Sequence, residues 1–133
     1  MANKTQKNEL QKNSMMAHLL DALEAGQEIG HYGRLVFAMV ARHFMDDQEL
    51  VDYLMKDPEC NEGDAKALVR QVEGKDYNPP KRERILEWQQ HQDFPICPNS
   101  EDPDNCNVYK DLTFPDAVYE HINSYYEQKP TVS

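Results

Sequence analysis

The chain has 133 residues, 39% of them hydrophobic, and its 24 acidic against 14 basic residues give a net charge of -10 at pH 7. This length suits one domain, and the charge argues against a broad electrostatic grip on nucleic acid or on an anionic membrane, so any phosphate site must be local. The longest apolar run, residues 35–41, is far shorter than the roughly 20 residues that span a bilayer. We therefore expect no membrane segment.

The first elements follow from the spacing of apolar residues. Residues 1–13 hold too few apolar side chains to be ordered, and we expect a mobile tail there. Ser14 suits the N-cap of a first helix that ends at Gly26. A turn over 29–33 then precedes a second helix over about 34–44, whose almost continuous apolar content predicts that it is central and buried.

Two shorter helices follow in the middle of the chain. Asp46 can cap a third helix, which ends at Asp57 and Pro58 because a proline disfavours helix at the residue before it. Asn61 opens a fourth helix that ends at Gly74. Both segments carry apolar residues at helical spacing, so each is expected to bury one face.

The C-terminal third is less regular. A corner at 78–80, with two prolines, precedes a fifth helix over 81–90. Residues 93–112 are rich in proline and acidic side chains and predict a long irregular loop, after which Thr113 starts a final helix.

The elements together predict an all-α fold. We expect one compact helical bundle of about six helices over residues 14–127, with a long irregular acidic loop and a second disordered tail over 128–133. No segment of the sequence has the pattern of a strand.

The sequence offers no catalytic motif. It lacks the nucleophile elbow, the phosphate-binding glycine loop and the zinc-protease helix, so we expect an accessory or binding protein rather than an enzyme. Cys97 and Cys106 could hold a metal, but their spacing is not that of a zinc knuckle, and unliganded loop cysteines are favoured. We expect no cofactor. The odd number of cysteines and the absence of an apolar leader favour a reducing cytoplasm.

Two clusters of cationic residues could bind an anion. Lys81, Arg82 and Arg84 open a helix, where backbone amides favour a negative group. His31 and Arg34 lie where a turn leads into the buried helix, a place where a guanidinium and backbone amides could hold a phosphate. The alternative is that Arg34 and Arg84 pair with carboxylates and His31 caps a turn, and the residues alone leave both readings open.

The order of motifs resembles one family. The motifs that carry the resemblance are Met15-Met16, residues 25–34 with His31-Tyr32-Gly33-Arg34, residues 70–74, Tyr77-Asn78-Pro79-Pro80, Ile96-Cys97-Pro98 and Cys106. Over residues 15–110 the chain is similar to the C-terminal domain of the large subunit of archaeal and eukaryotic-type DNA primases. That domain is helical and normally carries an iron–sulphur cluster, and cluster-free, stand-alone versions exist in the family.

The resemblance implies that the cluster has been lost. The family holds a [4Fe–4S] cluster with four cysteines. In this alignment Met15 and Arg82 occupy the first two ligand positions, while Cys97 and Cys106 occupy the third and fourth. A thioether and a guanidinium cannot replace two thiolates, and Arg82 could fill the space of the cluster.

The resemblance also implies a site. In the family this domain contacts the triphosphate of the initiating nucleotide and the end of the primer–template junction, while another subunit polymerises. By position, His31 and Arg34 would hold phosphates and Arg70 would approach nucleic acid. Ala65 and Ala67 replace aromatic residues of the family, which would remove stacking worth about 1–3 kcal/mol per base.

Three hypotheses result. The first is a non-catalytic primase accessory domain that works with a catalytic primase or polymerase subunit and binds the 5′ phosphate end of a primer or template, or single-stranded DNA or RNA. Its candidate residues are His31, Arg34, Arg70, Lys81, Arg82 and Arg84. The second is a protein-interaction module derived from that domain, using the loop 93–112 and the tyrosines Tyr119, Tyr125 and Tyr126. The third is a cluster or zinc ion shared between two chains through Cys97 and Cys106.

Overall fold

The computed structural model describes residues 9–75, 79–80, 82–97, 108 and 112, without the side chain of Arg82. Its helices are α2 (Ser14–Glu24), α3 (Gly30–Ala41), α4 (Asp47–Leu54), α5 (Glu62–Gly74) and α6 (Arg82–Gln89). No strand occurs in this part of the chain, which confirms the all-α class. Most of the acidic loop and the final helix expected from Thr113 lie outside the described residues, so the count of six helices stays a prediction. None of the described helices is long and apolar enough to cross a bilayer.

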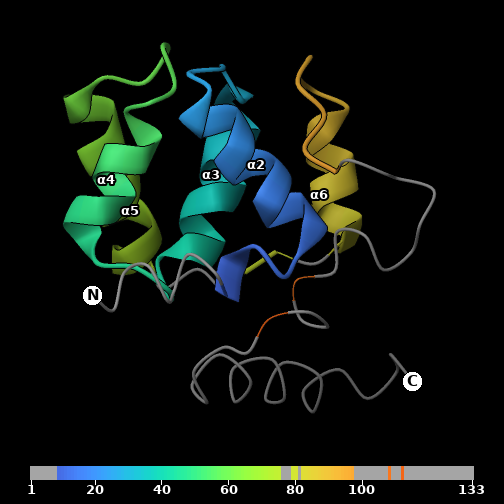
Figure 1. Ribbon diagram of the computed structural model, residues 1–133, viewed down its shortest axis with the longest axis horizontal. Helices are drawn as coiled ribbons and strands as arrows, with labels where there is room; N and C mark the ends of the chain where they lie inside the picture. The colour runs from blue at the N-terminus through green and yellow to red at the C-terminus, as the bar shows by residue number, and fades with distance from the viewer. Residues whose placement is uncertain (1–8, 76–78, 81, 98–107, 109–111, 113–133) are drawn as a thin grey trace.

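Helix α3 is the centre of the bundle. It packs against α2, α4, α5 and α6. Figure 1 shows α4 and α5 together on one side of the molecule and α6 on the other, with α2 and α3 between them. The prediction that the most apolar helix is central and buried is therefore confirmed.

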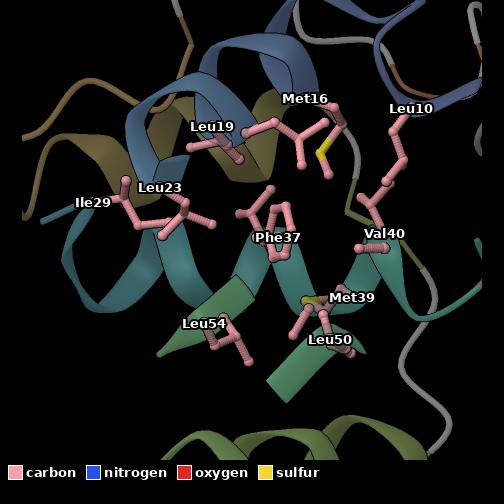
Figure 2. Close-up of a cluster of buried hydrophobic side chains, with 14 of the residues drawn as sticks. Leu10, Met16, Leu19, Leu23, Ile29, Phe37, Met39, Val40, Leu50 and Leu54 are labelled. Carbon is pink, nitrogen blue, oxygen red and sulfur yellow. The ribbon is translucent and has the colours of Figure 1, made fainter. Parts of the chain in front are cut away.

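The core lies mainly between α2, α3 and α4. Phe37 of α3 is fully buried, and in Figure 2 it lies between leucines of α2 and the leucines Leu50 and Leu54 of α4. Burying a side chain of this size contributes about 1.5–3 kcal/mol. Both Met15 and Met16 are also fully buried, so the position that the primase resemblance assigns to the first cluster ligand is part of the apolar core.

The ordered core begins earlier than the sequence predicts. Leu10 and Asn13 are fully buried, although both belong to the expected mobile tail. Asn13 rather than Ser14 is the N-cap of α2, because its side-chain oxygen accepts a hydrogen bond from the amide of Met16 at 3.0 Å. The side-chain caps predicted for α4 and α5, Asp46 and Asn61, are confirmed by bonds to Glu49 and Asp64.

The start of α3 also differs from the prediction. The helix begins at Gly30, so His31 and Arg34 lie within its first turns rather than in a turn that precedes it. Gly30 has a φ of +79°, which other residues adopt only with strain. The two glycines of this segment predicted a turn, but the chain uses Gly30 to enter the helix directly.

Candidate functional site: an aromatic and basic face on α3 and α6

Arg34 is bound within the protein. Its Nη1 donates to Oδ2 of Asp57 at 2.9 Å, and the two side chains are 15% and 0% exposed. The same carboxylate accepts the amides of Ile29 at 2.9 Å and Glu59 at 2.7 Å. A buried carboxylate with these partners is well satisfied, and it holds the guanidinium inside. Of the two interpretations of Arg34, pairing with a carboxylate is the one that the structure confirms.

An amide in the first turn of α3 is occupied as well. Gln92, in the segment after α6, accepts the amide of Tyr32 at 2.8 Å through Oε1. Its Nε2 donates to the carbonyls of Ile29 at 2.9 Å and Phe94 at 3.0 Å. A Cβ at position 30 would lie 2.5 Å from Gln92, so Gly30 makes room for this side chain. The place expected to hold a phosphate therefore holds a carboxamide.

The segment that carries Gln92 is fixed by further contacts. The amide of Cys97 donates to Gln89 Oε1 at 2.8 Å, and the ring of His18 in α2 stacks on Phe94 with centroids 5.0 Å apart. His18 Nε2 also lies 2.9 Å from the carbonyl oxygen of Pro95. Residues 92–97 thus cover the start of α3 as a built part of the fold.

Aromatic rings and one cation gather where α3 begins and α6 runs beside it. The rings of Tyr32 and Trp88 stack with centroids 5.7 Å apart and planes at 17°. His31 meets Tyr32 edge to face at 5.2 Å, and His91 lies 6.3 Å from the same ring. We name this set, together with Arg84, the aromatic–basic face. Tyr32 and Trp88 are half-buried, whereas both histidines are exposed.

Arg84 is the cation of this face. Its guanidinium lies 6.0 Å from the centroid of the Trp88 ring, within the range of a cation–π contact. Its side chain is 62% exposed, and the nearest carboxylate, Glu87, is 3.8 Å away. An exposed ion pair of this length holds the arginine weakly. Arg84 is therefore available to an anion while it stays near an aromatic surface.

The other predicted cations are distributed differently. Arg82 is the first residue of α6, whereas its side chain and all of Lys81 lie outside the described residues. Arg70 is an exposed residue of α5 and lines a groove of about 180 Å³ between α4 and α5. In Figure 1 that helix pair and α6 are on opposite sides of α2 and α3. The structure therefore brings His31 and Arg84 to one face and leaves Arg70 at another.

The alanines expected to replace stacking residues also differ in position. Ala65 is fully buried, and Ala67 is exposed two residues further along α5. Ala65 faces the core, so an aromatic ring at this position would have no access to nucleic acid. The stacked rings of Tyr32 and Trp88 lie on α3 and α6 instead.

The cysteines do not form a metal site in the described part of the chain. Cys97 is in a disulfide, so its sulfur offers no thiolate to iron or zinc. The sequence predicts a loop cysteine that holds no metal but does not predict this disulfide, and Cys106 lies outside the described residues. Cys60 is a buried free thiol whose pKa is raised by burial. Among the described residues no group of three or more histidine, cysteine or acidic side chains could hold a metal ion. Disulfides are typical of oxidising compartments, and the cytoplasmic location stays a prediction.

Sequence reasoning missed the partners that decide this site. The sequence predicts Asp57 only as the end of a helix, and Trp88 only as a residue of the fifth helix. Because a proline follows Asp57, the sequence pattern indicates a helix end there and gives no sign that the carboxylate is a buried hydrogen-bond acceptor. The signal that could have revealed the face is the pair of histidines at 31 and 91 beside Tyr32 and Trp88, since such rings at element ends are often exposed in part.

Comparison with known proteins adds no relative. No family model matches the chain. No curated protein and no solved structure matches it at a significant level.

Proposed function

We propose that this protein is a non-catalytic accessory domain, similar to the C-terminal domain of the primase large subunit, that works beside a catalytic primase or polymerase subunit. It binds the 5′ phosphate end of a primer or template, or a single strand of nucleic acid. The observation that supports this proposal is the aromatic–basic face. Here Arg84 lies over the ring of Trp88, which stacks on Tyr32, and the ring of His31 meets Tyr32 edge to face.

The chemistry of this face suits a nucleotide. A base that stacks on an aromatic ring contributes about 1–3 kcal/mol regardless of its identity, and a nearby guanidinium can bind the phosphate that follows it. The site is local, which agrees with a net charge of -10. Arg34 has no part in this proposal, because Asp57 holds it.

Trp88 gives the proposal a direct test, because it is the only tryptophan of the chain. Single-stranded oligonucleotides with a 5′ triphosphate or a 5′ hydroxyl are titrated into the protein at several salt concentrations while Trp88 fluorescence is recorded. We expect quenching by both, tighter binding of the triphosphate end, and affinity that falls with salt. Equal, negligible affinity for both oligonucleotides would contradict the proposal.

A matched pair of variants locates the binding. Arg84→Ala is expected to weaken binding several-fold, because it removes the cation beside the rings. Lys66→Ala is the control, since Lys66 is also exposed and also pairs with a glutamate of its own helix, Glu62 at 3.0 Å. Equal losses in both variants would show a diffuse charge effect rather than a site at α6.

A protein-interaction module is the second candidate. It is favoured because Arg34 is paired with Asp57 and the amide of Tyr32 donates to Gln92, which together fill one of the two predicted anion sites. Its proposed contacts, the loop 93–112 and the C-terminal tyrosines, lie mostly outside the described residues. A stoichiometric protein partner that survives nuclease treatment during purification from the native host would support this candidate.

A further inference from the structure

Helix α3 has no cap of its own. In α2, α4 and α5 the side chain that directly precedes the helix accepts an amide of the first turn, and these residues are Asn13, Asp46 and Asn61. Ile29 stands at the corresponding place before α3 and makes no side-chain cap bond. Amides in the first turn of a helix have no partner within that helix, so α3 needs an acceptor from elsewhere in the fold.

Gln92 supplies this acceptor from a distant part of the chain. Its Oε1 accepts the amide of Tyr32, the third residue of α3, which is the position that the local caps of α2, α4 and α5 also bind. Its Nε2 donates to the carbonyl of Ile29, on the other side of Gly30. Gln92 therefore binds the backbone on both sides of Gly30, the residue whose missing Cβ leaves room for it.

The same contacts determine how the two stacked rings of the aromatic–basic face meet. Trp88 belongs to α6, and Gln92 follows shortly after that helix ends at Gln89. Because Gln92 joins the chain after Trp88 to the backbone amide of Tyr32, it fixes the end of α6 against the first turn of α3. The rings of Tyr32 and Trp88 are stacked at this place, and both are half-buried.

We propose that Gln92 is the positioning residue of the aromatic–basic face: it holds Tyr32 stacked on Trp88 and so prepares the surface on which a base stacks. This inference rests on the proposed binding of a nucleotide to that face. Gln92 acts through the backbone, because its oxygen is bound to the Tyr32 amide and its Nε2 to two carbonyls. A surface that is ordered before binding loses less conformational entropy when the ligand arrives. Removal of Gln92 therefore weakens binding although it removes no charge.

Gln92→Met tests the positioning in the free protein. Methionine fills a similar volume but cannot donate to a carbonyl, and its sulfur is a weak acceptor. The near-ultraviolet circular dichroism of Trp88, the only tryptophan of the chain, reports whether its ring is held in a fixed environment. We expect Gln92→Met to lose most of this signal while the far-ultraviolet spectrum stays helical. Gln90→Met is the control, because Gln90 is exposed, and it should keep the signal. An unchanged tryptophan signal in Gln92→Met overturns the proposal.

The binding readout separates positioning from charge. A single strand with a 5′ triphosphate is titrated into the full chain and its variants at several salt concentrations. We expect Gln92→Met to weaken binding about three- to tenfold at every salt concentration, the factor that ordering one or two side chains on binding costs. Arg84→Ala instead lowers the slope of affinity against salt, because it removes a phosphate contact.

The outcomes of these experiments are distinguishable. If wild type binds and Gln92→Met binds equally well, or if the salt slope of Gln92→Met differs from that of wild type, the positioning role is overturned. A wild-type protein that does not bind the strand contradicts the proposed function, and the tryptophan signal of the free protein then still decides whether Gln92 holds the rings together.

A measurement on the unaltered protein covers the case in which Gln92→Met does not fold. The Tyr32 amide and the Asp64 amide are both capped at the third residue of a helix, but Gln92 is half-buried and Asn61 is exposed. We expect the Tyr32 amide to be better protected against hydrogen exchange than the Asp64 amide, because its cap is held by the tertiary fold. Protection of the Tyr32 amide no greater than that of Asp64 overturns the proposal.

Discussion

The starts of α3 and α6 show two fates of the same sequence feature. Each carries an arginine close to a helix start, and each was predicted to bind an anion. At α3 the protein itself fills the site, because Asp57 forms an ion pair with Arg34 and Gln92 accepts a hydrogen bond from the amide of Tyr32. At α6 the side chain of Arg84 is 62% exposed and lies over an aromatic ring.

Because Arg34 is bound and Arg84 is exposed, a cation in a sequence has no assigned role until its carboxylate partner is known. The partner of Arg34 is 23 residues away along the chain, and Gln92 is 60 residues from Tyr32. Neither distance has a helical period, so no local pattern reveals the contact. Substitutions at each of the two helix starts test this difference.

The largest effect is expected from Asp57→Ala. It leaves the guanidinium of Arg34 without its partner and two amides without an acceptor, in a place where water has little access. Removing one member of a buried ion pair costs about 3–5 kcal/mol, and denaturant unfolding measures the loss. A cost below about 1 kcal/mol would mean that Arg34 is not held by this pair, and the contrast between the two arginines would disappear.

A smaller effect is expected from Gly30→Ala. The left-handed conformation costs about 1–2 kcal/mol for a residue with a Cβ, and here that Cβ also meets Gln92 at 2.5 Å. Gly26→Ala is the matched variant, because Gly26 has a φ of +74° but no atom within 4 Å of the added Cβ.

The difference in unfolding free energy between these two variants isolates the contact with Gln92. Gly74→Ala serves as a second control, because it lies in a helix with open space around it and should be neutral or stabilising by up to about 1 kcal/mol. If Gly30→Ala and Gly26→Ala lower the unfolding free energy equally, Gln92 moves away from the added Cβ without a loss of stability.

The smallest effect on stability is expected from Arg84→Ala. Its pair with Glu87 is exposed and 3.8 Å long, so its removal should change the free energy of unfolding by less than about 0.5 kcal/mol. Thermal unfolding followed by circular dichroism measures this change. A loss larger than about 1 kcal/mol would place Arg84 in the fold, as Arg34 is, and would leave α6 without a free cation among its described side chains.

Most helices and the caps of α4 and α5 were predictable because their causes are local, whereas the cap of α2 was placed one residue late, at Ser14 instead of Asn13. Asp46 and Asn61 act within three residues of themselves, and the apolar run of α3 predicts its central place. The entry to α3 was not predictable, since it depends on Gln92 from a segment without periodicity. The site was likewise predictable only in part. The exposed cation Arg84 was predicted from its place near a helix start, whereas the stack of Tyr32 on Trp88 joins residues that only the tertiary fold brings together.

The most direct test of the account is amide chemical-shift mapping of the full chain with a 5′-triphosphate single strand. We expect the shifts to concentrate at His31, Tyr32 and Trp88, while Arg34, Asp57 and the α4–α5 groove stay unchanged. Shifts confined to Arg70 and its groove, or spread evenly over all exposed lysines and arginines, would contradict it.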